Sequence, residues 1–176
     1  LLIFGITFRL IALVSSMDEL GRLNLAPFSF FNGFGANPPV VGFSPALSGR
    51  TGLPKDTLIN IRETGEFTIS IIDSEMVDQM SLSSGEYPRG VDEYIKAGFS
   101  QYPAKKISIP GVKESKFIME CTLMDIIDLG NKPASGNLIL GEVVMFHVDE
   151  EVYDDDGRID PHLMDPVGRL GYAWYN

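Results

Sequence analysis

The chain has 176 residues, of which 44% are hydrophobic and 22% charged, as in an ordinary soluble globular protein. This length suits one domain with a full core, spanning 1–176, and is short for two. The net charge of −10, from 14 Lys and Arg against 24 Asp and Glu, argues against nucleic acid or an anionic membrane as the main partner, because both need a concentrated basic surface.

The first 14 residues, LLIFGITFRLIALV, are strongly apolar. The run is shorter than the roughly 20 residues that span a bilayer, and Arg9 interrupts it. It also lacks the basic start and the small-residue cleavage site of a signal peptide. We therefore predict a buried β-strand that ends near Ser15 and Ser16. The start without methionine leaves open that the chain is part of a longer product.

Two further strands are predicted after this one. A polar turn over 17–21, in which Gly21 supplies a positive φ, leads into a strand over 22–31, so the first two strands form a hairpin. The sequence Asn-Pro-Pro at 37–39 breaks the backbone before a short apolar strand at 40–43.

A helix is predicted over 56–64, with Asp56 or Thr57 as N-cap and Gly65 ending it. Residues 66–73, EFTISIID, alternate apolar and polar side chains and predict a half-buried strand.

The second half contains two short helices, two long strands and several loops. The expected helices lie around 76–80 and 92–96, on either side of a polar loop at 83–90. The expected strands lie at 117–127 and 137–148. Six or so strands with small inserted helices favour a mainly β fold, a closed β-barrel, over a parallel sheet.

Cys121 is the only cysteine, so it forms no internal disulfide, and one thiol is no metal site. It lies in an apolar run, and we expect it to be buried and unreactive. A reducing, cytoplasmic setting is therefore expected.

Several short motifs fail on inspection. Residues 42–46 imitate a nucleophile elbow but end in alanine and contain a proline that cannot begin the required helix. Gly33 and Gly35 lack the third glycine of a dinucleotide fingerprint. The acidic turn at 154–157 would place valine and leucine at the first and twelfth positions of a calcium loop, so a hairpin turn is the better interpretation. His147 and His162 lack any spacing that supports a metal site.

The segment that remains as a candidate binding site is the loop 48–54, which leads to the start of the predicted helix. Arg50, Lys55 and Thr57 would bring cations and a hydroxyl to a helix N-terminus, where unpaired amides attract an anion such as a phosphate. The alternative is a solvated, capped helix start, and residue chemistry alone leaves both open.

The chain resembles the flavin reductase-like, flavoredoxin-type family, whose members bind FMN in a split, Greek-key-like β-barrel. The resemblance spans nearly the whole chain and rests on these colinear segments: IALVS (11–15), NLAPFSFFN (24–32), NPPVVGFSP (37–45), KDTLINIRETGEF (55–67), LSSGEYPRGVDEY (82–94), GNLILGEVVMFHVD (136–149), GRIDP (157–161) and PVGRLGYAWY (166–175). The chain departs from the family at Leu10, where a proline usually follows the arginine, and at Gly35, where serine is common.

The resemblance implies a homodimer with FMN near the subunit interface. Arg50, Lys55 and Thr57 would hold the phosphate, and Asp56 would cap the helix. The residues implied to surround the isoalloxazine are Ser15, Ser29, Phe30, Phe31, Asn32 and Ser44. In the loop over the open side of the flavin, Ser83, Ser84 and Arg89 would border the nicotinamide. His147 and Trp174 would either approach the flavin or pack in the core.

The resemblance implies an oxidoreductase that passes electrons from NADH or NADPH through FMN to free flavin, another redox protein or a small molecule. The flavin would carry the chemistry, so no side-chain nucleophile or base is required. Two alternatives stay open: a flavoredoxin-like electron carrier without NAD(P)H activity of its own, and a non-redox ligand-binding barrel.

Overall fold

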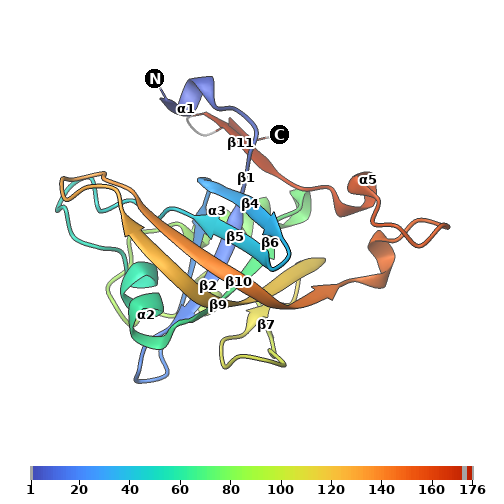
Figure 1. The fold of residues 1–176 in the computed structure, drawn as a ribbon, viewed down its shortest axis with the longest axis horizontal. Coiled ribbons are helices and arrows are strands. Elements are labelled where there is room, and N and C mark those ends of the chain that lie inside the picture. The colour runs from blue at the N-terminus through green and yellow to red at the C-terminus, as the bar shows by residue number, and fades with distance from the viewer. Residues whose placement is uncertain (1, 172–173, 176) are drawn as a thin grey trace.

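The protein is described by a computed structural model covering residues 2–171 and 174–175. Its main feature is a seven-stranded antiparallel sheet in the order β3-β2-β6-β9-β10-β5-β4, which curls into a barrel (Figure 1). The strands are β2 (Ala12–Met17), β3 (Leu23–Phe28), β4 (Phe31–Ala36), β5 (Pro39–Phe43), β6 (Glu66–Ile71), β9 (Phe117–Asp128) and β10 (Asn137–Val148). The predicted mainly β fold with short helices is confirmed.

The barrel closes over an aromatic core. The ring centroids of Phe28, near one edge of the sheet, and Phe43, near the other, lie 5.2 Å apart, and Phe43 lies 5.5 Å from Phe67. Helix α2 (Asp56–Thr64) packs against β2 and β3 and adds Leu58 and Ile61 to the same core. The two edges of the sheet therefore face one another across buried side chains.

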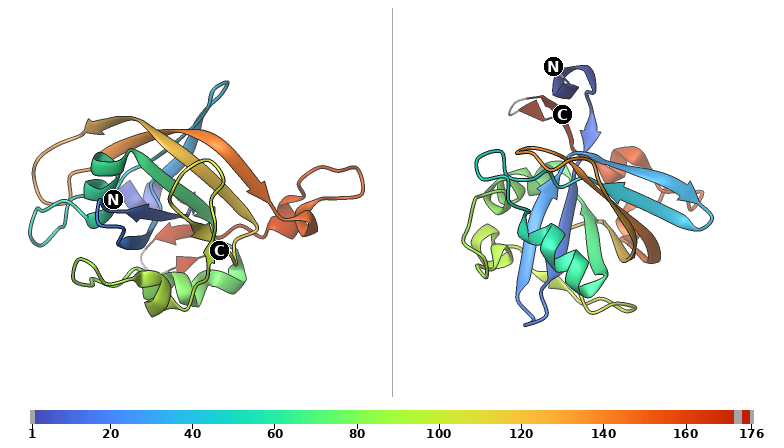
Figure 2. Two further views of the ribbon diagram at one scale, coloured as in Figure 1. Left: turned by 90° about the horizontal axis from the view of Figure 1, so that it is seen from below. Right: turned by 60° about the vertical axis from the view of Figure 1, so that its left-hand side comes forward.

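A second core lies outside the barrel. Helices α3 (Val77–Ser83) and α4 (Glu93–Ala97) contact the outer face of β3 (Figure 2). Strand β2 is buried on both faces, because Val14 points into the barrel core and Leu13 into the second core. Burial on two faces explains why this part of the sequence is continuously apolar rather than alternating.

The prediction of a strand over the first residues of the chain is wrong for the residues that precede Arg9. Residues 2–5 form a short exposed helix, α1 (Leu2–Gly5), and Phe8 has a φ of 57°, which interrupts an extended backbone. The chain then enters β1 (Arg9–Leu10), which pairs with β11 (Gly168–Gly171), itself paired with β12 (Trp174–Tyr175). This small sheet projects from the barrel and holds both ends of the chain together (Figure 1).

The strand predicted over 22–31 is two strands. β3 ends at Phe28, and β4 leaves with β5 as a hairpin that extends away from the barrel (Figure 2). β4 is exposed along most of its length, so it lacks the alternation by which strands are recognised in a sequence.

The other elements agree closely with the prediction. The helix over 56–64 has the predicted bounds and ends at Gly65, whose φ is 69°, and β10 also has the predicted bounds. The acidic turn at 154–157 forms a hairpin, closed by the pairing of Tyr153 with Ile159. The remaining elements are the 3-10 helices η1 (Ser74–Met76) and η2 (Glu150–Val152), the strands β7 (Gln101–Tyr102) and β8 (Gly111–Val112), and α5 (Pro161–Met164). Among the described residues, no helix is both long and apolar enough to cross a membrane.

Candidate functional site

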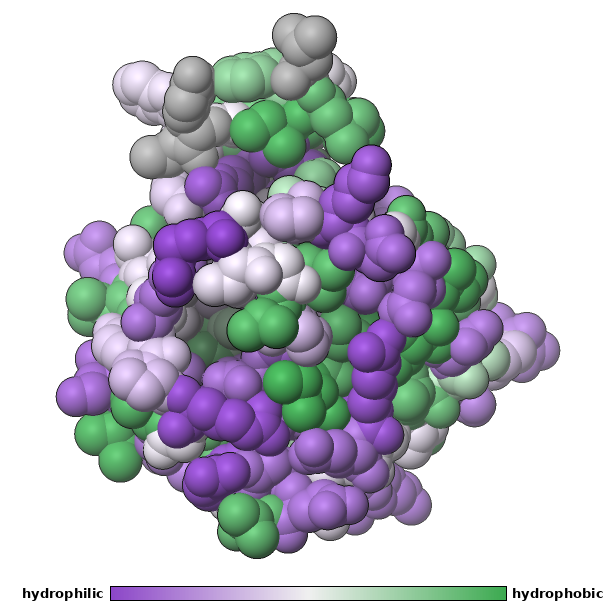
Figure 3. Space-filling model, turned by 90° about the vertical axis from the view of Figure 1, so that its left-hand side faces the viewer, coloured by the Kyte–Doolittle hydropathy of each residue, from purple (hydrophilic) through white to green (hydrophobic). Residues whose placement is uncertain are grey.

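A cavity of about 710 Å³ lies where the N-terminus of α2 meets the loops 46–54 and 83–87. Figure 3 looks onto this side of the molecule, where a hollow lies between mainly hydrophilic residues. The edge strand β3 forms one wall, and α3 another. The predicted site residues that line the cavity are Ser29, Arg50, Lys55, Asp56, Thr57, Ser83 and Ser84.

The N-terminus of α2 opens into this cavity without a side-chain cap. Lys55 is the N-cap residue and makes no capping hydrogen bond, so the prediction that Asp56 or Thr57 caps the helix is wrong. Asp56 is the first helical residue, and its Oδ1 accepts a hydrogen bond from Arg89 Nη1 at 2.8 Å. The Leu58 amide donates to the Lys55 carbonyl at 3.0 Å, so the first-turn amides left to attract an anion are those of Asp56 and Thr57.

The two cations expected at a phosphate lie at the cavity wall. Nζ of Lys55 lies 5.8 Å from the centre of the Phe28 ring. Nη2 of Arg50 lies 3.7 Å from Oε2 of Glu86, which belongs to the loop facing it across the cavity. The side chains of Arg50 and Glu86 are 77% and 82% exposed, so this ion pair is weak and readily exchanged.

Thr57 is the hydroxyl of the group and is almost completely buried. Its Oγ1 accepts a hydrogen bond from Asn24 Nδ2 on β3 at 2.9 Å, and both residues line the cavity. The structure thus brings together Arg50, Lys55 and Thr57, as the sequence predicts for an anion site.

Arg89 lies behind the cavity rather than in its wall. Besides Asp56 it contacts Asn60 Oδ1 through Nη2 at 3.2 Å, and Nη2 lies 3.7 Å from Glu63 and 3.8 Å from Asp18. The guanidinium therefore ties the loop 83–90 to α2 and to the β2–β3 turn.

Five residues expected around a flavin ring lie outside the cavity wall. Phe30, Phe31, Asn32 and Ser44 lie at the base of the β4–β5 hairpin, where the Ser44 amide donates to the carbonyl of Phe30 at 2.9 Å. Ser15 is buried on β2.

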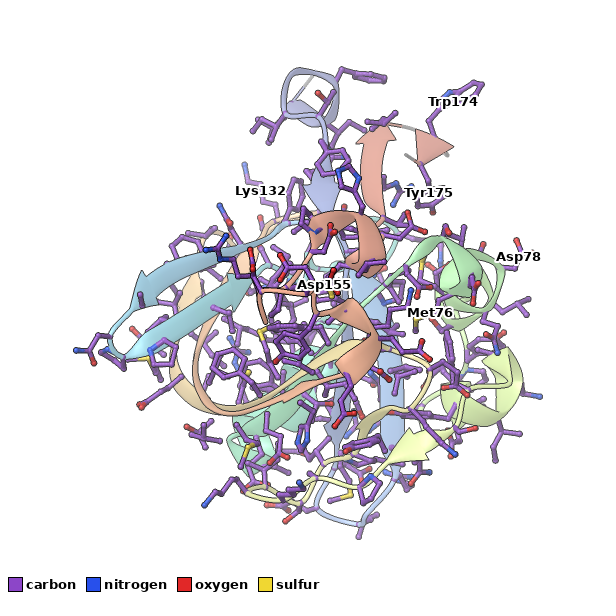
Figure 4. The ribbon with its side chains drawn as sticks, turned by 90° about the vertical axis from the view of Figure 1, so that its right-hand side faces the viewer. Met76, Asp78, Lys132, Asp155, Trp174 and Tyr175 are labelled. Atoms are coloured by element: carbon purple, nitrogen blue, oxygen red, sulfur yellow. The ribbon has the colours of Figure 1, made fainter. Side chains whose placement is uncertain are left out.

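His147 and Trp174 are also away from the cavity. His147 Nε2 lies 2.5 Å from Oε1 of Glu120, and its ring packs edge-on against Tyr102 with centroids 5.0 Å apart. Trp174 is 72% exposed on β12 and points away from the ribbon (Figure 4). The structure therefore packs His147 against its neighbours and leaves Trp174 in solvent.

The cavity also contains residues that the sequence did not single out. Glu93 of α4 is 8% exposed, and its Oε2 accepts a hydrogen bond from the Leu25 amide at 3.0 Å; burial raises the pKa of this carboxyl. Arg169 and Tyr175 come from the projecting sheet, with the guanidinium carbon 6.0 Å from the ring centre. All three lie within segments that carry the family resemblance, which is the signal that could have found them.

Residues 6–169 match the model of the flavin reductase like domain. The chain belongs to the flavin reductase-like family. A protein of Halalkalibacterium halodurans is 37% identical over 173 residues, which cover 97% of this chain and 81% of that protein.

The solved structures agree with this assignment. Nitrilotriacetate monooxygenase component B from Bacillus cereus superposes with a TM-score of 0.93 at 36% identity, covering 99% of this chain and 86% of that one. The 2-nitrobenzoate 2-nitroreductase NbaA of Pseudomonas fluorescens superposes with a TM-score of 0.87 at 30% identity, covering 99% and 83%. The fold is the split barrel of flavin reductase-like proteins, and the resemblance drawn from the sequence is confirmed.

Proposed function

We propose that this protein binds FMN and is an oxidoreductase that passes electrons from NADH or NADPH to an acceptor. The observation that carries the proposal is the convergence of Arg50, Lys55 and Thr57 at the uncapped N-terminus of α2, in a chain of the flavin reductase-like family. Cations, a hydroxyl and helix amides are the donor set of a phosphate site. A cavity of about 710 Å³ is in the range that holds cofactors.

In this proposal the chain's own residues bind and orient the cofactor. Arg50, Lys55 and Thr57 hold the phosphate, and Ser29 faces the ring from the wall beside Pro27, which has no amide hydrogen to offer. The base of the hairpin, with Phe30, Phe31, Asn32 and Ser44, continues that wall beyond the described cavity. When bound, FMN supplies the redox chemistry.

The loop 83–87 borders the cavity opposite Arg50 and is the proposed place of the nicotinamide. Ser83 and Ser84 line it, and Arg89 holds the loop in place through Asp56. The loop therefore excludes water from one side of the site without contributing a reacting group.

We propose that the protein is a homodimer. Large apolar side chains are exposed on α1, on the β4–β5 hairpin and on β12, among them Phe4, Phe34 and Trp174. Such exposure supports association of two copies. The buried free thiol of Cys121 supports a reducing cytoplasmic setting, which we propose as well.

A second candidate is an electron carrier that holds FMN and exchanges electrons with a protein. Eight of the chain's 24 acidic residues lie within residues 149–165, with one arginine among them. This lobe projects from the barrel (Figure 1), and its charge favours docking with a basic redox partner.

The absorption spectrum after FMN addition and desalting tests both candidates, followed by anaerobic NADH and NADPH. Retained yellow colour that bleaches with either nucleotide supports the enzyme, and bleaching by dithionite alone supports the carrier. Wild type that binds no FMN in a direct titration would refute both. Lys55→Gln should weaken FMN binding, since it removes a charged donor from the phosphate.

A further inference from the structure

The hydroxyl of Thr57 belongs to a directional hydrogen-bond chain that begins outside the cavity. Arg89 Nη2 donates to Asn60 Oδ1 at 3.2 Å, and Asn60 Nδ2 donates to Ser16 Oγ at 3.2 Å. Asn24 Nδ2 lies 3.5 Å from the same Ser16 oxygen and 2.9 Å from Thr57 Oγ1. Ser16, Asn60 and Thr57 are buried, and Asn24 is half-buried at the cavity wall.

The guanidinium of Arg89 fixes the donor and acceptor roles of Asn60. A guanidinium can only donate, so Asn60 presents its oxygen to Arg89 and its nitrogen to Ser16. The Ser16 hydroxyl can donate as well as accept, so it does not pass this direction on to Asn24. In the structure Nδ2 of Asn24 is the atom that faces Thr57 Oγ1, so Thr57 accepts from Asn24. The hydrogen of the Thr57 hydroxyl is then free to be donated, and among the described residues it is donated to no protein acceptor.

That free hydrogen matters because a phosphate only accepts hydrogen bonds at its ionised oxygens. Thr57 lines the cavity at the N-terminus of α2, beside Lys55. If Asn24 instead presented an oxygen to Thr57, the hydroxyl would donate to that oxygen and turn its lone pairs to the anion.

We propose that Asn24 is a positioning residue that orients the Thr57 hydroxyl as a donor to a phosphomonoester, so that the cavity selects FMN over riboflavin. This inference rests on the proposed FMN binding. Riboflavin has the same ring and ribityl chain without the phosphate, so the ratio of the two affinities reports on this end of the cavity.

The sharpest variant is Asn24→Asp, which keeps the shape but can only accept from Thr57 when ionised. We expect the FMN-over-riboflavin affinity ratio to fall about tenfold or more, as for a lost hydrogen bond to a charged group. The new carboxylate also repels the phosphate directly, and this part of the effect persists in the background of Thr57→Val. The part that disappears in that background is the part due to the misdirected hydroxyl, so the ratio should fall less there than in the presence of Thr57. Gln101→Glu, at an exposed position of β7, adds the same charge away from the cavity and should leave the ratio unchanged.

Asn24→Ala is measured in parallel, since it removes the donor without burying a charge. It should lower the ratio about threefold or more, and only when Thr57 is present. Both affinities come from flavin fluorescence titrations of variants whose melting curves match wild type.

The outcomes separate this inference from the proposed function. Wild type that binds neither flavin overturns the proposed function and the inference with it. Wild type that prefers FMN, combined with Asn24 variants that weaken both flavins equally, assigns Asn24 a purely structural role and overturns the inference alone. Equal effects with and without Thr57 overturn it as well.

Discussion

The contact between Arg50 and Glu86 leads to the prediction that Glu86→Gln strengthens FMN binding. The two side chains lie 3.7 Å apart on opposite sides of the cavity, and Arg50 is one of the cations assigned to the phosphate. Arg50 cannot give its full charge to a phosphate while it remains paired with a carboxylate. Glu86 is therefore a competitor of the ligand.

The exposure of the pair sets the size of the effect. Side chains that are 77% and 82% exposed form ion pairs of about 0–1 kcal/mol, because water and salt screen the charges. Removing the competitor should therefore tighten FMN binding by up to about fivefold. The gain should shrink at high ionic strength, where exposed charges interact less.

A fluorescence titration of FMN with wild type, Glu86→Gln and Asp155→Asn at two salt concentrations measures this. Asp155 lies in the acidic turn at 154–157 (Figure 4) and does not line the cavity, and Asp155→Asn removes the same charge as Glu86→Gln. Unchanged or weaker FMN binding by Glu86→Gln would refute the competition. An equal gain from Asp155→Asn would assign the effect to net charge instead.

Three further predictions concern stability. Burial raises the pKa of Glu93, so ionisation of this carboxyl destabilises the fold as the pH rises above about 4.5. The melting temperature of Glu93→Gln should therefore exceed that of wild type at about pH 8 and equal it at about pH 4. Burial also acts to raise the pKa of Glu120, but the hydrogen bond from His147 and three backbone amides outweigh it, so the pKa is lowered. The stability this gives is present above about pH 4.5 and is lost below it, and Glu120→Gln should flatten the acid limb of a pH series of urea unfolding. In Gly141→Ala, the new Cβ would lie 2.4 Å from Phe67 Cζ, and urea unfolding should show a loss of about 1–3 kcal/mol.

The parts of the fold that the sequence predicts well are those set by local signals. Helix α2 ends where Gly65 takes a positive φ, a conformation that glycine adopts without strain. Strand β10 ends in a hairpin loop at one side and a polar segment at the other, so its bounds follow from composition. The meeting of Arg50, Lys55 and Thr57 at one cavity follows because the three residues are close together in sequence.

The parts that were missed depend on distant contacts. The apolar residues 2–8 have the composition of a strand, but the sheet that β1 joins pairs only Arg9 and Leu10 with β11. The wall residues Glu93, Arg169 and Tyr175 reach the cavity only through the packing of α4 on β3 and of Tyr175 against the second core. No spacing within the sequence encodes those approaches.

The cavity has two ends of different rigidity, one formed by residues that are close together in the sequence and the other by residues from distant segments. The phosphate end rests on α2, whose Leu58 and Ile61 are fully buried in the barrel core, and on β3, whose edge amide at Leu25 is held by Glu93. The other end is formed by the loop 83–87 and the projecting sheet, which lie outside that core. Segments with fewer buried contacts open at lower free-energy cost. The end with Arg50, Lys55 and Thr57 is therefore the fixed part of the cavity, and the end bordered by the loop 83–87 is the part free to adapt.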